Sequence, residues 1–270
     1  MVRLSVNVNK IALLRNARGG DIPNLLKAVR TCSEAGCHGI TVHPRPDERH
    51  IRRSDVYEVA PVVMNEYGRE FNVEGYPSPD FLDLVCAVKP TQVTLVPDAP
   101  DVLTSNQGWA LDERTAWLRD AIKRLTEGGM RVSLFVEPDQ ETVRQAKEFG
   151  ANRIELYTGP YAMAFGTREG RAILKRHREA ALVAKSVGLG LNAGHDLNLD
   201  NLPAYVKNVP GLLETSIGQA LVADALYYGL KRTVRMYLKA LGSKPAALKR
   251  AKPVSAARKY PAKSASRGRY

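Results

Sequence analysis

Three side chains that can move protons near neutral pH follow short apolar segments of the chain: His43, Glu74 and His195. An imidazole has an ordinary pKa of about 6.5, so histidine can donate or accept a proton near neutrality. A glutamate acts as a base, or as an acid where burial raises its pKa. A single histidine is more often a hydrogen-bonded structural residue, and we interpret His38 and His177 in that way. Three such groups at three segment ends favour acid/base catalysis.

Other residues near segment ends are suited to binding anions. Arg45 and His50 follow the same segment as His43, and Arg18 lies in the first connection. Guanidinium forks fit phosphate oxygens. Gly218 precedes a predicted helix, where a glycine lets a ligand approach the backbone and the helix N-terminus offers free N–H groups. These segments are candidate phosphate sites, although an isolated arginine or a tight turn would also explain them.

Motifs for metals and nucleotides are absent from the sequence. His43, Glu74 and His195 could form a two-histidine, one-carboxylate metal set, but no local cluster such as HExxH supports that alternative. No GxGxxG follows the first predicted strand, and no Walker A segment is present. We therefore expect no metal and no nucleotide cofactor.

Eight short apolar segments must position these side chains. The predicted strands are 4–8, 39–42, 70–75, 92–96, 130–136, 153–157, 190–193 and 213–217. Helical patterns lie between them, most clearly at 111–127, 140–149, 168–187 and 219–241. This alternation predicts an α/β fold, a TIM (β/α)8 barrel with extra helices, rather than an open doubly wound sheet. Active sites of such barrels lie at the carboxyl ends of the strands, where the polar residues described above fall.

The net charge separates the chain into two parts. Residues 243–270 hold nine lysines and arginines and no acid, which leaves +3 of the net +12 for residues 1–242. We predict a catalytic domain over 1–242 and a disordered basic tail over 243–270, because the tail has few apolar residues to bury. Such a tail could contact nucleic acid, but a solvated extension is the favoured interpretation.

Other features of the composition bear on the compartment. No apolar run reaches the roughly 20 residues of a membrane helix, and no signal-peptide pattern opens the chain. The three cysteines, Cys32, Cys37 and Cys86, are odd in number and lack zinc spacing. We interpret them as small buried residues of a protein in the reducing cytoplasm, with no membrane contact.

Eight segments together resemble the pyridoxine 5′-phosphate synthase family over essentially all of residues 1–242. They are VNVNKIALLRNARG (6–19), GITVHPRPDERHI (39–51), FNVEG (71–75), LVPDAPDVLTS (95–105), VSLFVEP (132–138), IELYTGPYA (154–162), LNAGHDL (191–197) and SIGQAL (216–221). The tail matches nothing in the family pattern.

The resemblance implies a reaction and the residues that carry it. The family condenses 3-amino-2-oxopropyl phosphate with 1-deoxy-D-xylulose 5-phosphate, and it yields pyridoxine 5′-phosphate, inorganic phosphate and water without a metal or cofactor. His43, Glu74 and His195 fall at catalytic positions, and Glu155 falls at a position that stabilises the transition state. Residues at positions that contact the aminoketone phosphate are Asn7, Arg18, Asp196, Gly218 and Gln219. Those at positions that contact the deoxyxylulose phosphate are Asn9, Lys10, Arg45, His50 and Thr104.

The chain departs from the commonest family pattern in the binding residues. Asn9-Lys10 stand where many members have Asp-His, Gln219 where many have His, and Asp196 where Gly is common. The proton-transfer residues are unchanged. The resemblance also implies a homo-octamer, and 97–110 is our candidate for a loop that closes over the substrates.

Two alternatives remain open. One is another phosphate-binding barrel enzyme, a lyase or an isomerase, although no Schiff-base lysine ends the sixth strand, where Glu155 and Tyr157 lie. The other is a nucleic-acid-binding protein that acts through its basic tail.

Overall fold

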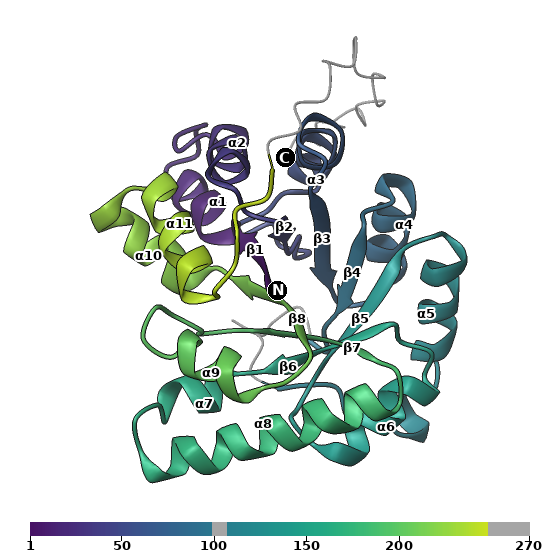
Figure 1. Cartoon of the computed structure of the whole chain (residues 1–270). Coiled ribbons are helices and arrows are strands. Elements are labelled where there is room, and N and C mark those ends of the chain that lie inside the picture. The colour runs from purple at the N-terminus through teal and green to yellow at the C-terminus, as the bar shows by residue number, and fades with distance from the viewer. Residues whose placement is uncertain (99–106, 248–270) are drawn as a thin grey trace.

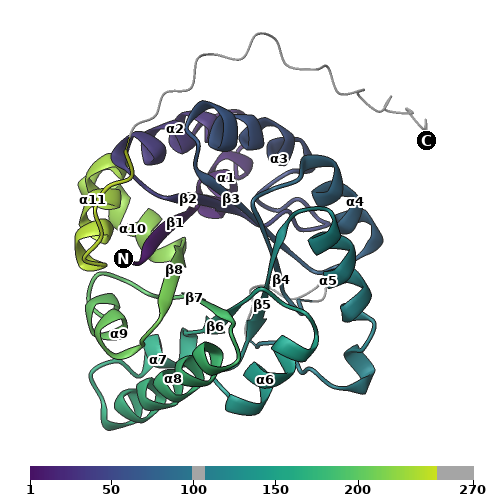
Figure 2. The ribbon, with the colours of Figure 1, turned by 45° about the vertical axis from the view of Figure 1, so that its right-hand side comes forward.

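The eight strands form one closed parallel barrel. This computed structural model describes residues 1–98 and 107–247, and each strand pairs with its neighbours in chain order until β8 meets β1 (Figures 1 and 2). The strands are β1 (Arg3–Asn7), β2 (Gly39–Val42), β3 (Glu70–Gly75), β4 (Gln92–Leu95), β5 (Arg131–Val136), β6 (Arg153–Tyr157), β7 (Gly190–Gly194) and β8 (Leu212–Ile217). The predicted TIM barrel is confirmed, and each predicted strand end lies within one residue of the observed end.

Helices surround the barrel (Figure 2). They are α1 (Asn9–Asn16), α2 (Leu25–Ala35), α3 (Arg53–Ala60), the π-helix η1 (Pro61–Glu66), α4 (Pro79–Val88), the 3-10 turn η2 (Glu113–Thr115), α5 (Leu118–Glu127), α6 (Gln140–Glu148), α7 (Gly159–Met163), α8 (Arg168–Ser186), α9 (Leu202–Asn208), α10 (Gln219–Tyr228) and α11 (Leu230–Ala240). The single helix predicted over 219–241 is wrong. Gly229 has a φ of 77°, which a continuing α-helix cannot contain, so the segment forms α10 and α11.

The strands alternate between apolar and polar side chains. Residues such as Leu4, Val6, Val73 and Ile154 belong to the buried core between the barrel and its helices. The residues between them contact one another across the inside of the barrel, as Gln92 of β4 does with Glu214 of β8. The apolar content of these segments predicts strands that are buried and apolar on both faces. Polar side chains instead alternate with apolar ones along the strands, and they give the barrel a polar interior.

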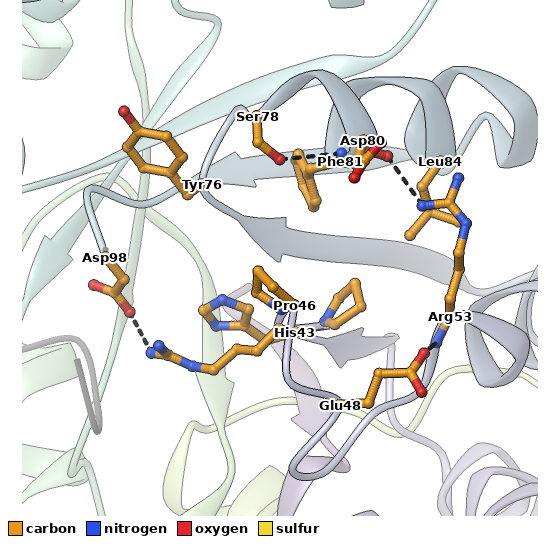
Figure 3. A pocket seen from close by; sticks show the side chains of 12 residues that line it. His43, Pro46, Glu48, Arg53, Tyr76, Ser78, Asp80, Phe81, Leu84 and Asp98 are labelled. Carbon is orange, nitrogen blue, oxygen red and sulfur yellow. Dashed lines mark hydrogen bonds and ion pairs between the residues drawn. The ribbon is translucent and has the colours of Figure 1, made fainter. Parts of the chain in front are cut away.

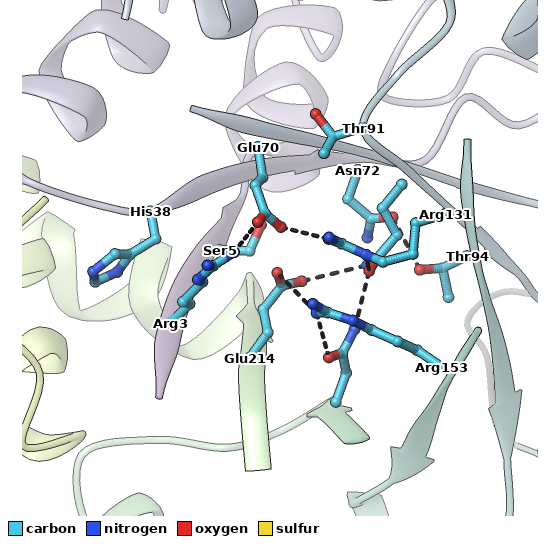
Figure 4. A network of polar contacts seen from close by, with 12 residues as sticks. Arg3, Ser5, His38, Glu70, Asn72, Thr91, Thr94, Arg131, Arg153 and Glu214 are labelled. Carbon is cyan, nitrogen blue, oxygen red and sulfur yellow. Dashed lines mark hydrogen bonds and ion pairs between the residues drawn. The ribbon is translucent and has the colours of Figure 1, made fainter. Parts of the chain in front are cut away.

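Toward the amino ends of the strands this interior holds a charged network (Figure 4). Arg131 donates to Gln92 Oε1 at 2.8 Å and to Glu70 Oε2 at 2.5 Å. Arg153 donates to Asn192 Oδ1 at 3.1 Å. Burial, and after it the charge of nearby Arg131, lowers the pKa of Arg153 to about 10. The network fills space that apolar side chains occupy in many barrels.

The start of the predicted tail lies against the barrel. Ser243 donates to the carbonyl of Val2, the Ala246 N–H donates to Gly36 O at 2.9 Å, and Arg69 donates to Ala246 O at 3.3 Å. We call residues 243–247 the strap. The predicted disorder of the remaining tail concerns residues 248–270, which lie outside the described residues.

Candidate active site

The carboxyl ends of the strands surround a cavity of about 470 Å³. Most of the predicted site residues line it: Asn7, Asn9, Lys10, His43, Arg45, His50, Glu74, Glu155, His195, Asp196, Gly218 and Gln219. Arg18 is exposed beyond α1 and does not line the cavity, and Thr104 lies outside the described residues, as does most of the predicted closing loop. Predicted site residues from six strands and the connections that follow them, distant in sequence, thus line one cavity.

Sequence reasoning missed several residues of the wall. They are Leu13, Arg49, Thr94, Val96, Phe135 and Ser216. Thr94 and Ser216 follow the same alternation that turns Glu74 and Glu155 inward, so the period of two could have identified them. No comparable signal marks the loop residue Arg49.

Asparagine side chains join the first three strands at the cavity. The Asn9 N–H donates to Asn7 Oδ1 at 3.0 Å, and the His43 N–H donates to Asn9 Oδ1 at 2.9 Å. Asn7 Nδ2 in turn donates to Glu74 Oε2 at 3.4 Å. This chain of contacts fixes the ends of β1, β2 and β3 relative to one another. It also gives Asn9 a structural task, because its side chain holds the backbone of a catalytic candidate.

His43 and Glu74 form a buried pair with unusual protonation. His43 Nδ1 lies 3.9 Å from Glu74 Oε2. Burial, the main cause, together with the charges of Asp98 and Glu214 and against the opposing charge of Arg45, raises the pKa of Glu74 to about 8. Burial and the Arg45 charge hold the pKa of His43 well below its usual range. Near pH 7 the histidine is therefore a neutral proton acceptor beside a glutamic acid that is mostly protonated.

Glu155 is a second protonated carboxyl group. It lies on β6 with its side chain buried, and within the described part of the chain its Oε2 atom has no hydrogen-bond partner. Burial raises its pKa well above the ordinary value, and Glu74 adds to the effect. A Cβ atom at Gly194 would collide with this carboxyl, so β7 leaves the space open for it. A neutral carboxylic acid here can donate a hydrogen bond to charge that develops on a substrate oxygen.

The third proton-transfer candidate, His195, lies in a strained turn after β7. His195 has a φ of 86° and Asp196 a φ of 59°, both in the left-handed region. Thr158 donates to the carbonyls of Gly194 and His195, which holds this backbone in place. His195 Nδ1 lies 3.2 Å from Asp196 Oδ2, and its ring packs edge-on against Tyr157 at 5.4 Å between centroids. The imidazole is thus oriented by contacts on several sides.

One side of the cavity is rich in groups that can bind an anion. Arg45, Lys10 and Arg49 bring positive charge. Burial, followed by the charges of Arg45 and Lys10, lowers the pKa of His50 to about 4, so this imidazole is neutral at pH 7. Its Nδ1 accepts a hydrogen bond from the Ile51 N–H at 2.9 Å, so the proton resides on Nε2. His50 is therefore a neutral hydrogen-bond donor.

A second region that can bind an anion is the junction between β8 and α10. Gly218 precedes α10, and a Cβ atom built on it would lie 3.1 Å from Asn7 Cβ. The first N–H groups of α10 have no partners within a helix, so this end can bind a second anion. The two anion regions line the same cavity as the proton-transfer residues, and the strands that carry them, β8 and β1–β2, are neighbours in the barrel.

Outside this cavity the other histidines have structural contacts. His177 Nδ1 lies 2.9 Å from the hydroxyl of buried Tyr205, and His38 Nδ1 accepts from the Leu4 N–H at 3.1 Å. Over residues 1–98 and 107–247, no group of three or more His, Cys, Asp or Glu side chains could hold a metal ion.

The family model described as pyridoxal phosphate biosynthesis protein PdxJ matches residues 4–243. The chain belongs to the PdxJ family. Its curated relatives include the pyridoxine 5′-phosphate synthases of Bacteroides fragilis (53% identical; 88% of this chain and 98% of the relative), Parabacteroides distasonis (53%; 90% and 100%) and Cytophaga hutchinsonii (52%; 89% and 99%). The family resemblance expected from the eight sequence segments is confirmed.

More distant solved structures share the barrel with this PdxJ family member. Phosphoribosylanthranilate isomerase from Thermotoga maritima aligns with a TM-score of 0.56 at 14% identity, covering 90% of this chain and 99% of that one. Tryptophan synthase from M. tuberculosis aligns with a TM-score of 0.60 at 13% identity, covering 90% and 94%. At such low identity the likeness concerns the fold alone.

Proposed function

We propose that this chain is a pyridoxine 5′-phosphate-forming enzyme. It condenses 3-amino-2-oxopropyl phosphate with 1-deoxy-D-xylulose 5-phosphate and releases inorganic phosphate and water. One observation supports this above all: His43, Glu74, Glu155 and His195 line a single cavity that also contains two candidate anion-binding regions. Two phosphorylated substrates need two such regions, and ring closure between them needs several proton transfers.

The side chains divide the proton transfers between them. Imine formation joins the substrate amine to the ketone carbon and expels water, so a base must accept protons from nitrogen and an acid must protonate the departing oxygen. Neutral His43 accepts, whereas Glu74 and His195 donate. Glu155 donates a hydrogen bond to the carbonyl oxygen as negative charge develops on it.

The binding residues divide in the same way. Arg45, His50, Lys10, Asn9 and Thr104 bind the deoxyxylulose phosphate. The aminoketone phosphate is bound by Gly218, Gln219, Asn7 and Asp196. Arg18, which the resemblance assigned to the same substrate, is left out of this set because it does not line the cavity. The α10 N-terminus supports the second assignment, and the positive charge of Lys10 and Arg45 supports the first.

The deciding experiment is incubation of the purified protein with both substrates and mass detection of pyridoxine 5′-phosphate. If no product formed, whichever substrate was added first, the proposal would be rejected. The family resemblance also predicts that no metal or cofactor is needed, so turnover should survive exhaustive chelation. Loss of turnover after chelation, restored by zinc or magnesium, would contradict that prediction.

We also propose that copies of the chain assemble into a homo-octamer. Large apolar side chains are exposed on α10, where Leu226 is 73% and Tyr227 84% accessible, and Leu14 of the neighbouring helix α1 is 55% accessible. This surface could bury its apolar area against another copy. Light scattering should give eight chains, and Tyr227→Lys should reduce that number, whereas Leu182→Lys on the exposed face of α8 should not.

We place the enzyme in the cytoplasm. Cys32 and Cys37 are buried free thiols, and Cys86 is a partly buried one, as expected in a reducing compartment. The described segments contain no helix both long and apolar enough to cross a bilayer. Cell fractionation with an antibody tests the assignment, and recovery in an oxidising compartment would contradict it.

A further inference from the structure

A second cavity adjoins the reaction chamber. It has a volume of about 270 Å³, and His43 and Arg45 line both cavities. Asp98 lies on its wall, next to Tyr76 and opposite the loop that follows β2 (Figure 3). The Arg45 side chain therefore separates the two spaces, and whatever holds Arg45 determines the direction in which its guanidinium points.

Asp98 makes a short, buried ion pair with that guanidinium. Its Oδ2 atom lies 2.6 Å from Arg45 Nη2, and the two side chains are only 3% and 5% exposed. Charge-assisted contacts of this length fix the direction of an arginine fork. Removing one partner of a buried pair leaves the other charge uncompensated, so the guanidinium would reorient.

The same aspartate acts on the proton-transfer pair. Burial is the main cause of the raised pKa of Glu74, the negative charge of Asp98 is the next, and Arg45 works against both. Charged and titratable groups surround Glu74 from several elements. They are His43 and Arg45 after β2, Asp98 after β4, Glu155 on β6 and Glu214 on β8. Asp98 and Arg45 thus form a charged unit beside the acid.

We propose that Asp98 is a positioning residue, which aims Arg45 at the phosphate of 1-deoxy-D-xylulose 5-phosphate and thereby links phosphate binding to proton transfer at Glu74. The inference rests on the proposed function. A phosphate dianion bound at Arg45 neutralises the guanidinium charge, which otherwise favours the ionised form of Glu74. Binding of that substrate therefore keeps the proton on Glu74, where the condensation needs an acid.

Two substitutions separate orientation from charge. Asp98→Ala removes the hold on Arg45, so the KM for deoxyxylulose phosphate should rise about tenfold while the KM for the aminoketone phosphate stays within about twofold. Asp98→Asn has the same shape and keeps a carbonyl acceptor for Arg45, but it lacks the charge. The limb of its pH–rate profile that reports Glu74 should move to lower pH by roughly half a unit or more.

The matched control is Asp83→Asn on α4, which removes one negative charge from an exposed pair with Arg124. It should leave both KM values and the pH profile unchanged. Folded Asp98 variants with wild-type KM values and an unshifted profile would overturn the proposal, although wild-type turnover would still support the proposed function. If the wild type formed no product, infrared titration of the Glu74 carboxyl in the wild type and in Asp98→Asn would test whether Asp98 controls the protonation of Glu74. A lower pKa in Asp98→Asn would support the link, and an equal pKa would refute it.

Discussion

At the scale of single residues, the site depends on two carboxyl groups that burial keeps protonated. Glu74 and Glu155 lie in the same cavity, and after burial the Glu74 charge further raises the pKa of Glu155. Isolated carboxylic acid side chains in water lose their protons near pH 4, so they could not act as acids at neutral pH. The barrel interior thus favours the protonated form of both glutamates and the neutral form of His43 beside them.

Glu74→Gln should lower kcat by about 10²–10⁴-fold, because glutamine cannot donate a proton. Since the pKa of Glu74 is about 8, wild-type activity should fall as the pH rises above that value and the acid form is lost. The pH–rate profile of the variant should lack this limb. Near-normal turnover in a folded Glu74→Gln protein would remove Glu74 from the mechanism.

The same substitution should stabilise the fold at alkaline pH. The pKa of Glu74 rises from 4.5 to about 8 on folding, so between these values the folded state binds more protons than the unfolded state. Wild-type stability therefore decreases as the pH rises through this window. Urea unfolding should show an advantage of Glu74→Gln that is larger at pH 8 than at pH 5, and an equal difference at both pH values would contradict the assignment.

At the scale of elements, the junctions between strands and helices create the two anion regions. α10 begins immediately after β8, so its free N–H groups point from the rim of the barrel. Arg45 and His50 belong to the connection from β2 to α3. Under the proposed assignment the two substrates depend on different junctions, so damage to one junction should affect one substrate more than the other.

Gly218→Val should raise the KM for the aminoketone phosphate more than the KM for the deoxyxylulose phosphate. A side chain at this position would press on Asn7, whose Cβ lies 3.1 Å from the added atom, and would intrude on the anion. Steady-state kinetics with each substrate varied in turn gives the comparison.

Arg45→Ala should show the opposite selectivity. Loss of a charge-assisted hydrogen bond should weaken deoxyxylulose phosphate binding by about 1.5–3 kcal/mol. Gln219→His, which restores the commoner family residue, is the tolerated control. Equal damage to both substrates by Gly218→Val and by Arg45→Ala would show that the assignment of two separate regions is wrong.

Much of this element-level picture could be predicted from the sequence. Strand-length apolar segments bounded by polar residues define the eight strands, and polar residues after them define most of the cavity. The break at Gly229 could not be predicted with the same certainty, because an isolated glycine inside an amphipathic pattern often stays helical. The pairing of Arg45 with Asp98 was also hidden, since it joins two loops that only the closed barrel brings together.

At the scale of the whole molecule, the two ends of the barrel have separate tasks. The carboxyl ends of the strands carry the reaction cavity, and the amino ends carry the charged network and the strap. The strap packs directly against Gly36. A Cβ atom built on this glycine would lie 3.0 Å from the Pro245 backbone. Stability and chemistry can therefore be altered independently.

Two truncations test this separation. Removal of residues 248–270 should leave turnover and thermal stability unchanged, whereas removal of 243–270 should lower the Tm by several degrees. The longer deletion loses the hydrogen bonds to Gly36 and Val2, each worth about 0.5–1.5 kcal/mol. Thermal unfolding and turnover of both proteins give the answer. Loss of turnover with the shorter deletion would show that the basic tail takes part in function.

The contact between Ser243 and Val2 has a consequence for the order of the chain. It places the first and last residues of the barrel side by side, and β1 pairs with β8 as any other neighbours do. A closed ring of this kind has no required starting point, so a short linker from residue 243 to residue 2 would allow the chain to begin elsewhere. New termini at exposed Gly166, between α7 and α8, should yield a circular permutant with the same far-ultraviolet circular dichroism spectrum.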